Sequence, residues 1–240
     1  MKKIRLITVF LILAVVLTVA LNYEVSTKQG FDTEMRIIRI PLYLKALDFF
    51  DRYFNYKVLS ARITKGVAGD EEKAMALLAW THENIKKNPQ SLPVIDDHAW
   101  HIIVRGYGLD DQFQDVFTTL CNHAGLNAFF YSLPTAEDPK RKKPLSFVML
   151  NGEWAVFDAY KGVYFRAKGG KERRTFATVS QIAAGDWEVS PLDGGDTSWD
   201  YAPYFKNILS IDYRDWGISR PAIQSPFRRF IYFLKGEPKS

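Results

Sequence analysis

The hydrophobic periodicity of the chain changes at Gly125, and this change limits the fold more than any other feature. Before it, the apolar residues of the segment from Asp111 to Ala124 recur at helical spacing and share one face. After it come short aromatic and β-branched runs, and Asn151-Gly152 between two of them is a strong signal for a two-residue hairpin. Helices followed by an antiparallel sheet predict the α+β class.

The same patterns predict further elements on both sides of this change. Helices are expected after Pro41, from Asp70 and from Asp96, with residues 24–35 as a polar linker before them. Strands are expected at residues 128–131, 146–150, 153–158 and 162–165. The charged segment 135–144 contains two prolines and is expected to form a loop between strands.

An apolar run from Leu6 to Leu21 follows three basic residues, Lys2, Lys3 and Arg5. The run is slightly shorter than the ~20 apolar residues of a membrane-spanning helix, and Thr18-Val19-Ala20 is a weak cleavage site. A retained signal anchor and a cleaved signal peptide are both open, and the poor cleavage site favours the anchor. In either case the positive-inside rule puts the basic end in the cytoplasm and the following domain outside it, periplasmic or extracellular.

Composition narrows the classes of function. The aromatic share of 15% argues against disorder, and the single cysteine excludes both an internal disulfide and a cysteine-cage zinc site. The net charge is +5, and basic clusters such as residues 140–143 predict a solvated surface. Anionic lipid headgroups or an acidic polysaccharide are the sharper alternative for these clusters. No nucleic-acid recognition motif is present, so nucleic acid is not an expected partner.

The segment from Gly106 to Phe165 resembles the core of the transglutaminase-like superfamily, which shares the papain-type arrangement. In that family a Gly-rich turn leads to a helix that begins with the catalytic Cys. A strand bearing the catalytic His follows, and an Asp comes after the return strand. Here the turn is Gly106-Tyr107-Gly108, the hairpin lies around Asn151-Gly152, and Asp158 closes the motif. The resemblance implies a helical half packed on an antiparallel sheet, preceded by one N-terminal hydrophobic helix.

Two catalytic positions of the family are replaced. Its spacing puts Asp110 where the nucleophilic cysteine belongs. The candidates for the His position are Lys143, Pro144 and Leu145, so only Asp158 stays in place. A carboxylate is a poor acyl nucleophile at neutral pH, whereas Asp is a preferred N-cap worth ~1 kcal/mol. We therefore expect Asp110 to cap its helix, and the chain to be a degenerate bacterial member that lacks the catalytic Cys and His.

The resemblance implies a binding or scaffolding protein of the bacterial envelope, without a cofactor and with a role in surface polysaccharide production. The former active-site cleft would be lined by Trp100, Asp110, Gln112, Trp154 and Asp158. An active hydrolase or transferase that uses Asp110 and Asp158 on a glycan or peptide is the alternative, and a purely structural partner of an envelope complex is a third. Two weaker alternatives are a metal site at His98 and His101, which share a helix face, and a nucleophilic Cys121.

The sequence divides into four predicted parts. A signal anchor or signal peptide occupies residues 1–23, and a linker with N-terminal helices occupies residues 24–69. The transglutaminase-like core is expected at residues 70–182. Residues 183–240, rich in aromatics and proline, are expected to wrap the domain.

Overall fold

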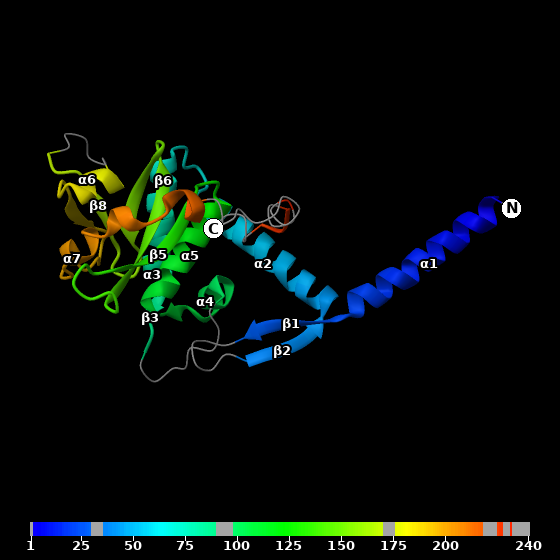
Figure 1. The fold of residues 1–240 in the computed structure, drawn as a ribbon. Coiled ribbons are helices and arrows are strands. Elements are labelled where there is room, and N and C mark those ends of the chain that lie inside the picture. The colour runs from blue at the N-terminus through cyan, green and yellow to red at the C-terminus, as the bar shows by residue number, and fades with distance from the viewer. Residues whose placement is uncertain are drawn as a thin grey trace. The chain divides into compact units, whose positions relative to one another are not determined.

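The computed structural model describes residues 2–29, 36–89, 98–169, 176–217, 225–227 and 231. The chain divides into two compact units, and the boundary between them falls inside one long helix, between Arg52 and Tyr53. Figure 1 labels the elements of both units. The predicted helix start at Asp96 lies outside the described residues.

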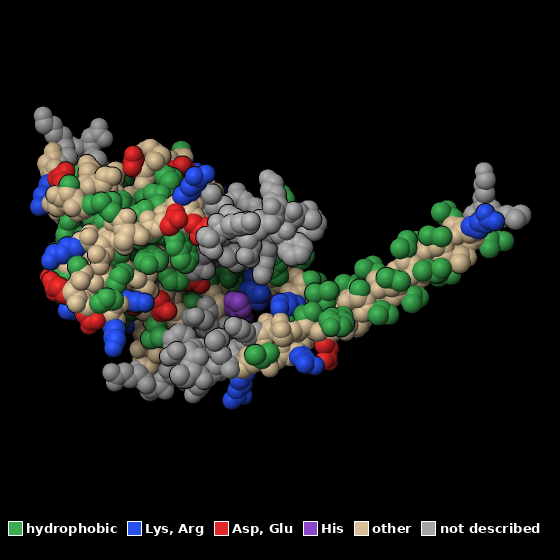
Figure 2. Space-filling view, viewed as in Figure 1, with side chains coloured by type: hydrophobic (Ala, Val, Ile, Leu, Met, Phe, Trp, Pro, Cys, Tyr) green, Lys and Arg blue, Asp and Glu red, His purple; other side chains and the backbone are tan. Residues whose placement is uncertain are grey.

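The N-terminal unit begins with α1 (Lys2–Asn22), and its apolar side chains are exposed along its length. Within the described residues, α1 is the helix long and apolar enough to cross a membrane, with a mean hydropathy of 2.8 over Lys3–Asn22. Figure 2 shows hydrophobic side chains along α1 and basic ones near its N-terminal end. The predicted N-terminal hydrophobic helix is confirmed, and its composition is typical of a membrane span.

A two-stranded hairpin follows α1 where a linker was predicted. Strand β1 (Glu24–Gln29) pairs antiparallel with β2 (Arg36–Pro41), so the linker prediction is wrong for residues 24–29. The N–H of Leu42 donates to the carbonyl of Tyr23 at 2.9 Å and closes the hairpin at its base. Helix α2 (Leu42–Ile63) starts directly after Pro41, as the sequence predicted.

The second unit contains the predicted helices in a row. They are the last turns of α2, then α3 (Asp70–Asn84), α4 (Ala99–Arg105) and α5 (Asp110–His123). Gly106 ends α4 in the left-handed region at φ 74°, a conformation that glycine adopts without steric cost. The chain then enters β4 (Tyr107–Gly108), which pairs in parallel with β3 (Lys86–Lys87). This turn sets the direction in which α5 starts.

A five-stranded antiparallel sheet forms the other half, with its strands in sequence order. The strands are β5 (Ala128–Pro134), β6 (Lys142–Leu150), β7 (Glu153–Asp158), β8 (Val163–Arg166) and β9 (Glu188–Pro191). The predicted hairpin is confirmed: Asn151 and Gly152 have φ of 53° and 84°, as a type I′ turn requires. The predicted loop is too long, because β6 already begins at Lys142 and carries Lys143.

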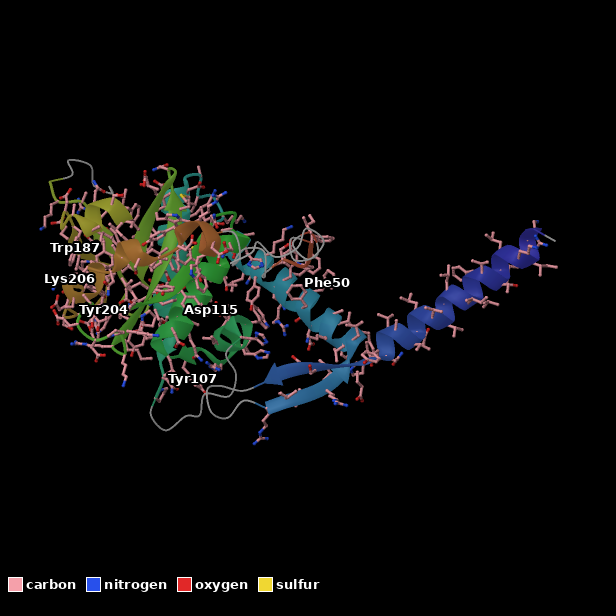
Figure 3. The ribbon with its side chains drawn as sticks, viewed as in Figure 1. Phe50, Tyr107, Asp115, Trp187, Tyr204 and Lys206 are labelled. Atoms are coloured by element: carbon pink, nitrogen blue, oxygen red, sulfur yellow. The ribbon has the colours of Figure 1, made fainter. Side chains whose placement is uncertain are left out.

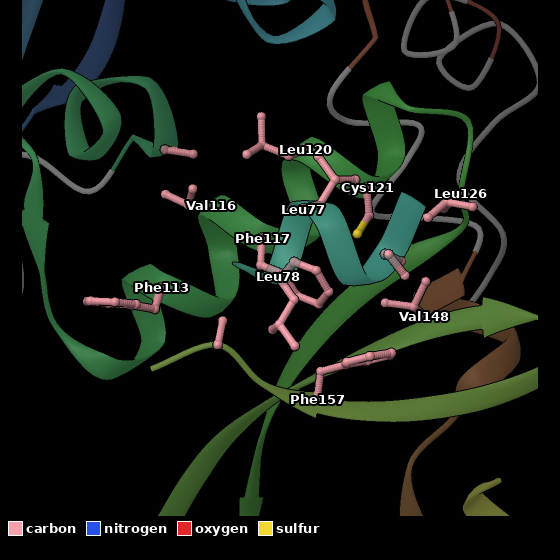
Figure 4. Close-up of a cluster of buried hydrophobic side chains, with 14 of the residues drawn as sticks. Leu77, Leu78, Phe113, Val116, Phe117, Leu120, Cys121, Leu126, Val148 and Phe157 are labelled. Carbon is pink, nitrogen blue, oxygen red and sulfur yellow. The ribbon is translucent and has the colours of Figure 1, made fainter. Parts of the chain in front are cut away.

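The two faces of the sheet bury different clusters, because side chains alternate along a strand. Phe157 faces the helix-side cluster, which packs α3, α4 and α5 on the sheet (Figure 4). Val156 faces the C-terminal cluster on the other side. That layer contains α6 (Val179–Ala183), α7 (Ala202–Phe205) and the short helix η2 (Ile208–Ser210), and Figure 3 labels Trp187 and Tyr204 within it. Residues 188–211 therefore supply a strand and a hydrophobic layer to the domain.

Candidate functional site

Asp110 begins α5 but does not cap it. Leu109 is the N-cap residue, and its side chain has no hydrogen-bond acceptor. The backbone N–H of Leu109 donates to Oε1 of Gln112 at 3.1 Å. Asp111 supplies the acceptor for the N–H of Gln112 at 3.0 Å. The predicted capping role of Asp110 is wrong, because its carboxylate accepts hydrogen bonds from Lys143 and Gln114 instead.

Lys143 bridges two carboxylates. Its Nζ lies 2.6 Å from Oδ2 of Asp110 and 2.7 Å from Oδ2 of Asp158. The side chain of Lys143 is 2% exposed, that of Asp158 0% and that of Asp110 31%. We call these three residues the ion cluster. It joins the first residue of α5 to β6 and to the last residue of β7.

Gln114 fixes both carboxylates from one side. Its Nε2 donates to Oδ1 of Asp110 at 3.2 Å and to Oδ1 of Asp158 at 3.0 Å. Its Oε1 accepts from Oγ of Ser146 at 2.8 Å and from the N–H of Ala159 at 3.1 Å. The buried amide thus uses both donors and both lone pairs, which makes the arrangement rigid. The next residue on α5, Asp115, is labelled in Figure 3.

Asp158 also accepts hydrogen bonds from the C-terminal part of the domain. The hydroxyl of Tyr201 donates to Oδ2 at 2.7 Å, and the N–H of Lys161 donates to Oδ1 at 3.1 Å. Burial, reinforced by the charge of Asp158, raises the pKa of Tyr201 far above its usual value, so the hydroxyl remains a donor. Asp158 therefore accepts hydrogen bonds from four donors: Lys143, Gln114, Tyr201 and the N–H of Lys161.

Burial and the neighbouring charges shift the pKa values of Asp110 and Lys143. Burial first, and then Asp158, raises the pKa of Asp110 to about 6, against the opposing effect of Lys143. Burial alone disfavours the ammonium form of Lys143, but the two carboxylates outweigh it and raise the pKa of Lys143 above its usual value. At neutral pH Lys143 therefore keeps its proton, and both carboxylates are occupied by donors.

Aromatic and basic side chains surround the bridging lysine. The ring centroids of Trp199 and Tyr160 lie 5.5 Å and 5.6 Å from Nζ of Lys143. Nζ of Lys161 lies 5.6 Å from the Trp199 ring, and Nζ of Lys87 lies 4.9 Å from the Tyr160 ring. We call Lys87, Tyr160, Lys161 and Trp199 the rim. The buried indole N–H of Trp199 has no acceptor among the described residues.

The structure does not gather the other predicted binding residues around Asp110 and Asp158. Trp100 packs edge-to-face on Tyr56 at 5.8 Å, at the border of the helix-side cluster. Trp154 packs on Phe129 at 5.0 Å, at the border of the C-terminal cluster on the other face of the sheet. Oε1 of Gln112 accepts hydrogen bonds from Leu109 and, at 2.6 Å, from Arg105, so this buried side chain shapes the turn before α5.

The remaining sequence candidates lie elsewhere. Cys121 is fully buried in the helix-side cluster, and burial raises the pKa of its thiol well above the usual range. His123 points its Nδ1 at the carbonyl of Thr119 at 2.8 Å. The rings of His98 and His101 are 5.8 Å apart. In the described part of the chain, no group of three or more His, Cys, Asp and Glu side chains is arranged to hold a metal ion.

Sequence reasoning missed part of this site. Lys143 was one of three candidates for the histidine position, but its strand was predicted to begin too late. Gln114 could have been predicted as a partner of Asp110, because it lies four residues further along the helix and residues four apart share a helix face. Tyr201 gave none, since it approaches Asp158 from 43 residues further along the chain.

Comparison with known proteins agrees with this architecture. Residues 57–169 match the model of the transglutaminase-like superfamily, so this part of the chain is a transglutaminase-like core. The match begins inside α2 and ends just after β8, so it starts before the predicted core of residues 70–182. A search of the curated proteins found no significant match.

Three solved structures are similar. One is a proposed cysteine protease from Cytophaga hutchinsonii, at 13% identity and TM-score 0.37, with 60% of this chain and 52% of that chain covered. Another is a proposed protease from Parabacteroides distasonis, at 11% identity and TM-score 0.38, with 72% and 39% covered. The third is a TGase, at 12% identity and TM-score 0.35, with 62% and 46% covered. The chain spans about half or less of the length of these proteins.

Proposed function

We propose that this protein is a membrane-anchored transglutaminase-like domain that binds or scaffolds envelope components and does not catalyse acyl transfer. The observation that carries the proposal is the ion cluster. Acyl transfer by a cysteine enzyme needs a thiolate and a base that accepts and returns protons. Here Asp110 lies at the start of α5, and Lys143 is a protonated amine held between two carboxylates.

The same geometry disfavours the alternative, a hydrolase or transferase that uses Asp110 and Asp158 on a glycan. Paired carboxylates in glycosidases flank the bond that is cleaved, with room between them for the sugar or an attacking water. In this protein the ammonium group of Lys143 contacts both carboxylates at hydrogen-bond distance. Gln114 and Tyr201 occupy further lone pairs, so neither carboxylate is placed to flank the glycosidic bond of a bound glycan as acid, base or nucleophile.

The rim supports a binding role and indicates the ligand class. Tyr160 and Trp199 offer aromatic rings, Lys87 adds positive charge beside Tyr160, and the ammonium group of Lys161, beside Trp199, pairs with Asp196. Ligand sites combine apolar and aromatic surfaces with a few polar groups that fix orientation. Aromatic rings flanked by lysines suit an anionic glycan, whose sugar rings stack while its acidic groups meet the ammonium groups. This ligand agrees with a role in surface polysaccharide production.

The N-terminal helix supports the location. α1 has the length and hydropathy of a membrane span, and the basic residues Lys3 and Arg5 lie at its start. Basic residues flanking a span stay on the cytoplasmic side. The transglutaminase-like core then faces outward, to the periplasm or the cell exterior, where envelope polysaccharides occur.

The test uses the full chain in detergent micelles and a panel of acidic and neutral surface glycans. We expect binding of an acidic glycan that is recovered chemically unchanged, and at least tenfold weaker binding for Trp199→Ala and Lys87→Ala. Lys206→Ala is the matched control, because Lys206 is 61% exposed and pairs with Glu137. Cleavage or transfer of the glycan that is lost in Asp110→Ala would overturn the proposal and support the enzyme.

A further inference from the structure

The ion pair of Lys143 and Asp110 brings an amine and a carboxyl group together in a mostly buried place. Nζ of Lys143 lies 2.6 Å from Oδ2 of Asp110, so the carboxyl carbon, one bond further, lies within about 4 Å of the amine. The two residues are 33 positions apart, yet α5 and the pairing of Lys143 with Leu133 hold both in place. The domain itself therefore supplies the proximity that a bimolecular reaction lacks.

The surroundings favour an uncharged product. Lys143 is 2% exposed and lies between the rings of Tyr160 and Trp199, and Asp158 is fully buried. Taking an ammonium and carboxylates out of water is costly, even when they are paired. An amide in the same place carries no charge. Its formation would remove that cost without moving the backbone elements that hold the two side chains.

We propose that Lys143 and Asp110 join in an intramolecular amide (isopeptide) bond, which the folded domain forms with Asp158 as the proton acceptor. In the step, the ammonium of Lys143 passes a proton to the carboxylate of Asp158. The neutral amine then attacks Cγ of the protonated Asp110 carboxyl group, an N–C bond forms, and a C–O bond breaks to release water. Asp158 ends protonated, so atoms and charge balance without an oxidant or cofactor.

The two carboxyl groups differ in ways that assign these roles. Asp110 is 31% exposed, which gives the released water a path to solvent, and its pKa of about 6 makes the protonated form accessible. Asp158 is fully buried and accepts hydrogen bonds from Gln114, Lys161 and Tyr201, donors that stabilise a carboxylate. Asp110 is therefore the electrophile and Asp158 the base.

The bond goes beyond the proposed binding function and does not depend on it. It would close a covalent loop between the first turn of α5 and β6. Such a loop restricts the unfolded chain in the way a disulfide does, and the sequence, with one cysteine, contains no internal disulfide. A domain exposed outside the cell would gain stability that no reductant removes.

Tryptic peptide mapping of the full chain tests the proposal. Trypsin separates Asp110, in the peptide of residues 106–140, from Lys143, in the peptide of residues 143–161. We expect a branched species whose mass is the sum of both peptides minus one water. Full recovery of the two peptides in separate, unmodified form would overturn the inference. A loss of water within residues 143–161 alone would also overturn it, because it would link Lys143 to Asp158.

Variants check the roles. Lys143→Arg keeps the positive charge but cannot form the amide, and Asp158→Asn keeps both reacting groups but removes the base. Both should give two separate peptides, whereas Asp111→Asn, one residue from the reacting carboxyl group, should give the branched species. A branched species in Asp158→Asn at the wild-type yield would contradict the role of Asp158. These results come from peptide masses, so they are separable from failure of glycan binding.

Discussion

The two ends of α5 lie in opposite environments. At its N-terminal end, Asp110 and Gln114 belong to a polar network that also contains Lys143 and Asp158. Two turns further on, Phe117, Leu120 and Cys121 are fully buried among apolar side chains (Figure 4). The single thiol of this chain, Cys121, lies in the apolar part of the helix and not at its start.

This difference teaches that the two ends of one helix can meet opposite packing requirements within the same fold. The C-terminal half of α5 needs only apolar volume, which many sequences supply. The N-terminal end needs matched charges, since a buried ammonium is stable only with partners. Asp110, Lys143 and Asp158 meet that need, because Lys143 pairs with both carboxylates.

The largest loss of stability is expected from a substitution at the polar, N-terminal end of α5. Lys143→Ala leaves two carboxylates facing each other without a counter-charge, and removing one partner of a buried ion network costs about 3–5 kcal/mol. Denaturant unfolding of the full chain measures the loss. The neighbouring exposed Lys142→Ala is the matched control and should change stability by less than about 0.5 kcal/mol. Equal effects for the two variants would show that the ion cluster is not structural.

A large effect is also expected at the apolar end. Leu120 is fully buried, and Leu120→Ala should cost about 2–5 kcal/mol through lost burial and the cavity left behind. Leu209, which is 66% exposed in the short helix η2, provides the control, and Leu209→Ala should be close to neutral. Comparing unfolding midpoints of the two variants tests whether α5 packs on the sheet as described.

In the C-terminal part of the domain, the hydroxyl group of Tyr201 should contribute measurably to stability. Tyr201→Phe removes a hydrogen bond to the Asp158 carboxylate, and a bond to a charged group is worth about 1.5–3 kcal/mol. Tyr213 donates instead to the neutral carbonyl of Ile208 at 2.7 Å, so Tyr213→Phe should cost only about 0.5–1.5 kcal/mol. A reversed order in thermal unfolding would show that Tyr201 does not hold Asp158.

The smallest expected effect is on the pH dependence of the folding stability. Burial lowers the pKa of His123, at the C-terminal end of α5, below its unfolded value of 6.5. The unfolded chain then takes up a proton more readily than the folded one. The stability contributed by the neutral His123 is therefore present above pH 6.5 and is lost as pH falls through the folded pKa. His123→Gln should flatten the decline in stability between pH 7.5 and pH 5. An unchanged slope would mean that His123 is accessible to protons in the folded state.

The sequence predicted the fold better than the site, for physical reasons. The apolar face of α5 and the Asn151-Gly152 turn are local signals, and both elements formed where expected. Strand β6 was started too late because Lys143 and Pro144 resemble loop residues. In the fold Lys143 is buried and ion-paired, and Pro144 lies opposite Ser132 in the sheet, so both belong to the strand.

The site required contacts that no local pattern encodes. Asp110 was expected to cap its helix because Asp is a common N-cap, but the nearby ammonium of Lys143 competes for the carboxylate and wins. Tyr201 lies in a segment expected only to wrap the domain, and it reaches Asp158 through the folding of β9 and α7. Trp100 and Trp154 were grouped with Asp110 by the resemblance, whereas the two clusters on opposite faces of the sheet hold them apart.

The claim that the ion cluster replaces the catalytic machinery can be measured directly with an activated acyl ester such as p-nitrophenyl acetate. The full chain in detergent micelles, its Asp110→Ala variant and its Asp110→Cys/Lys143→His double variant are compared in one assay. The account predicts equal, background rates for the wild-type protein and Asp110→Ala. A burst of p-nitrophenol is expected from the double variant, in which a thiol and an imidazole return to the positions of the family's residues. A wild-type rate above background that disappears in Asp110→Ala would contradict the account.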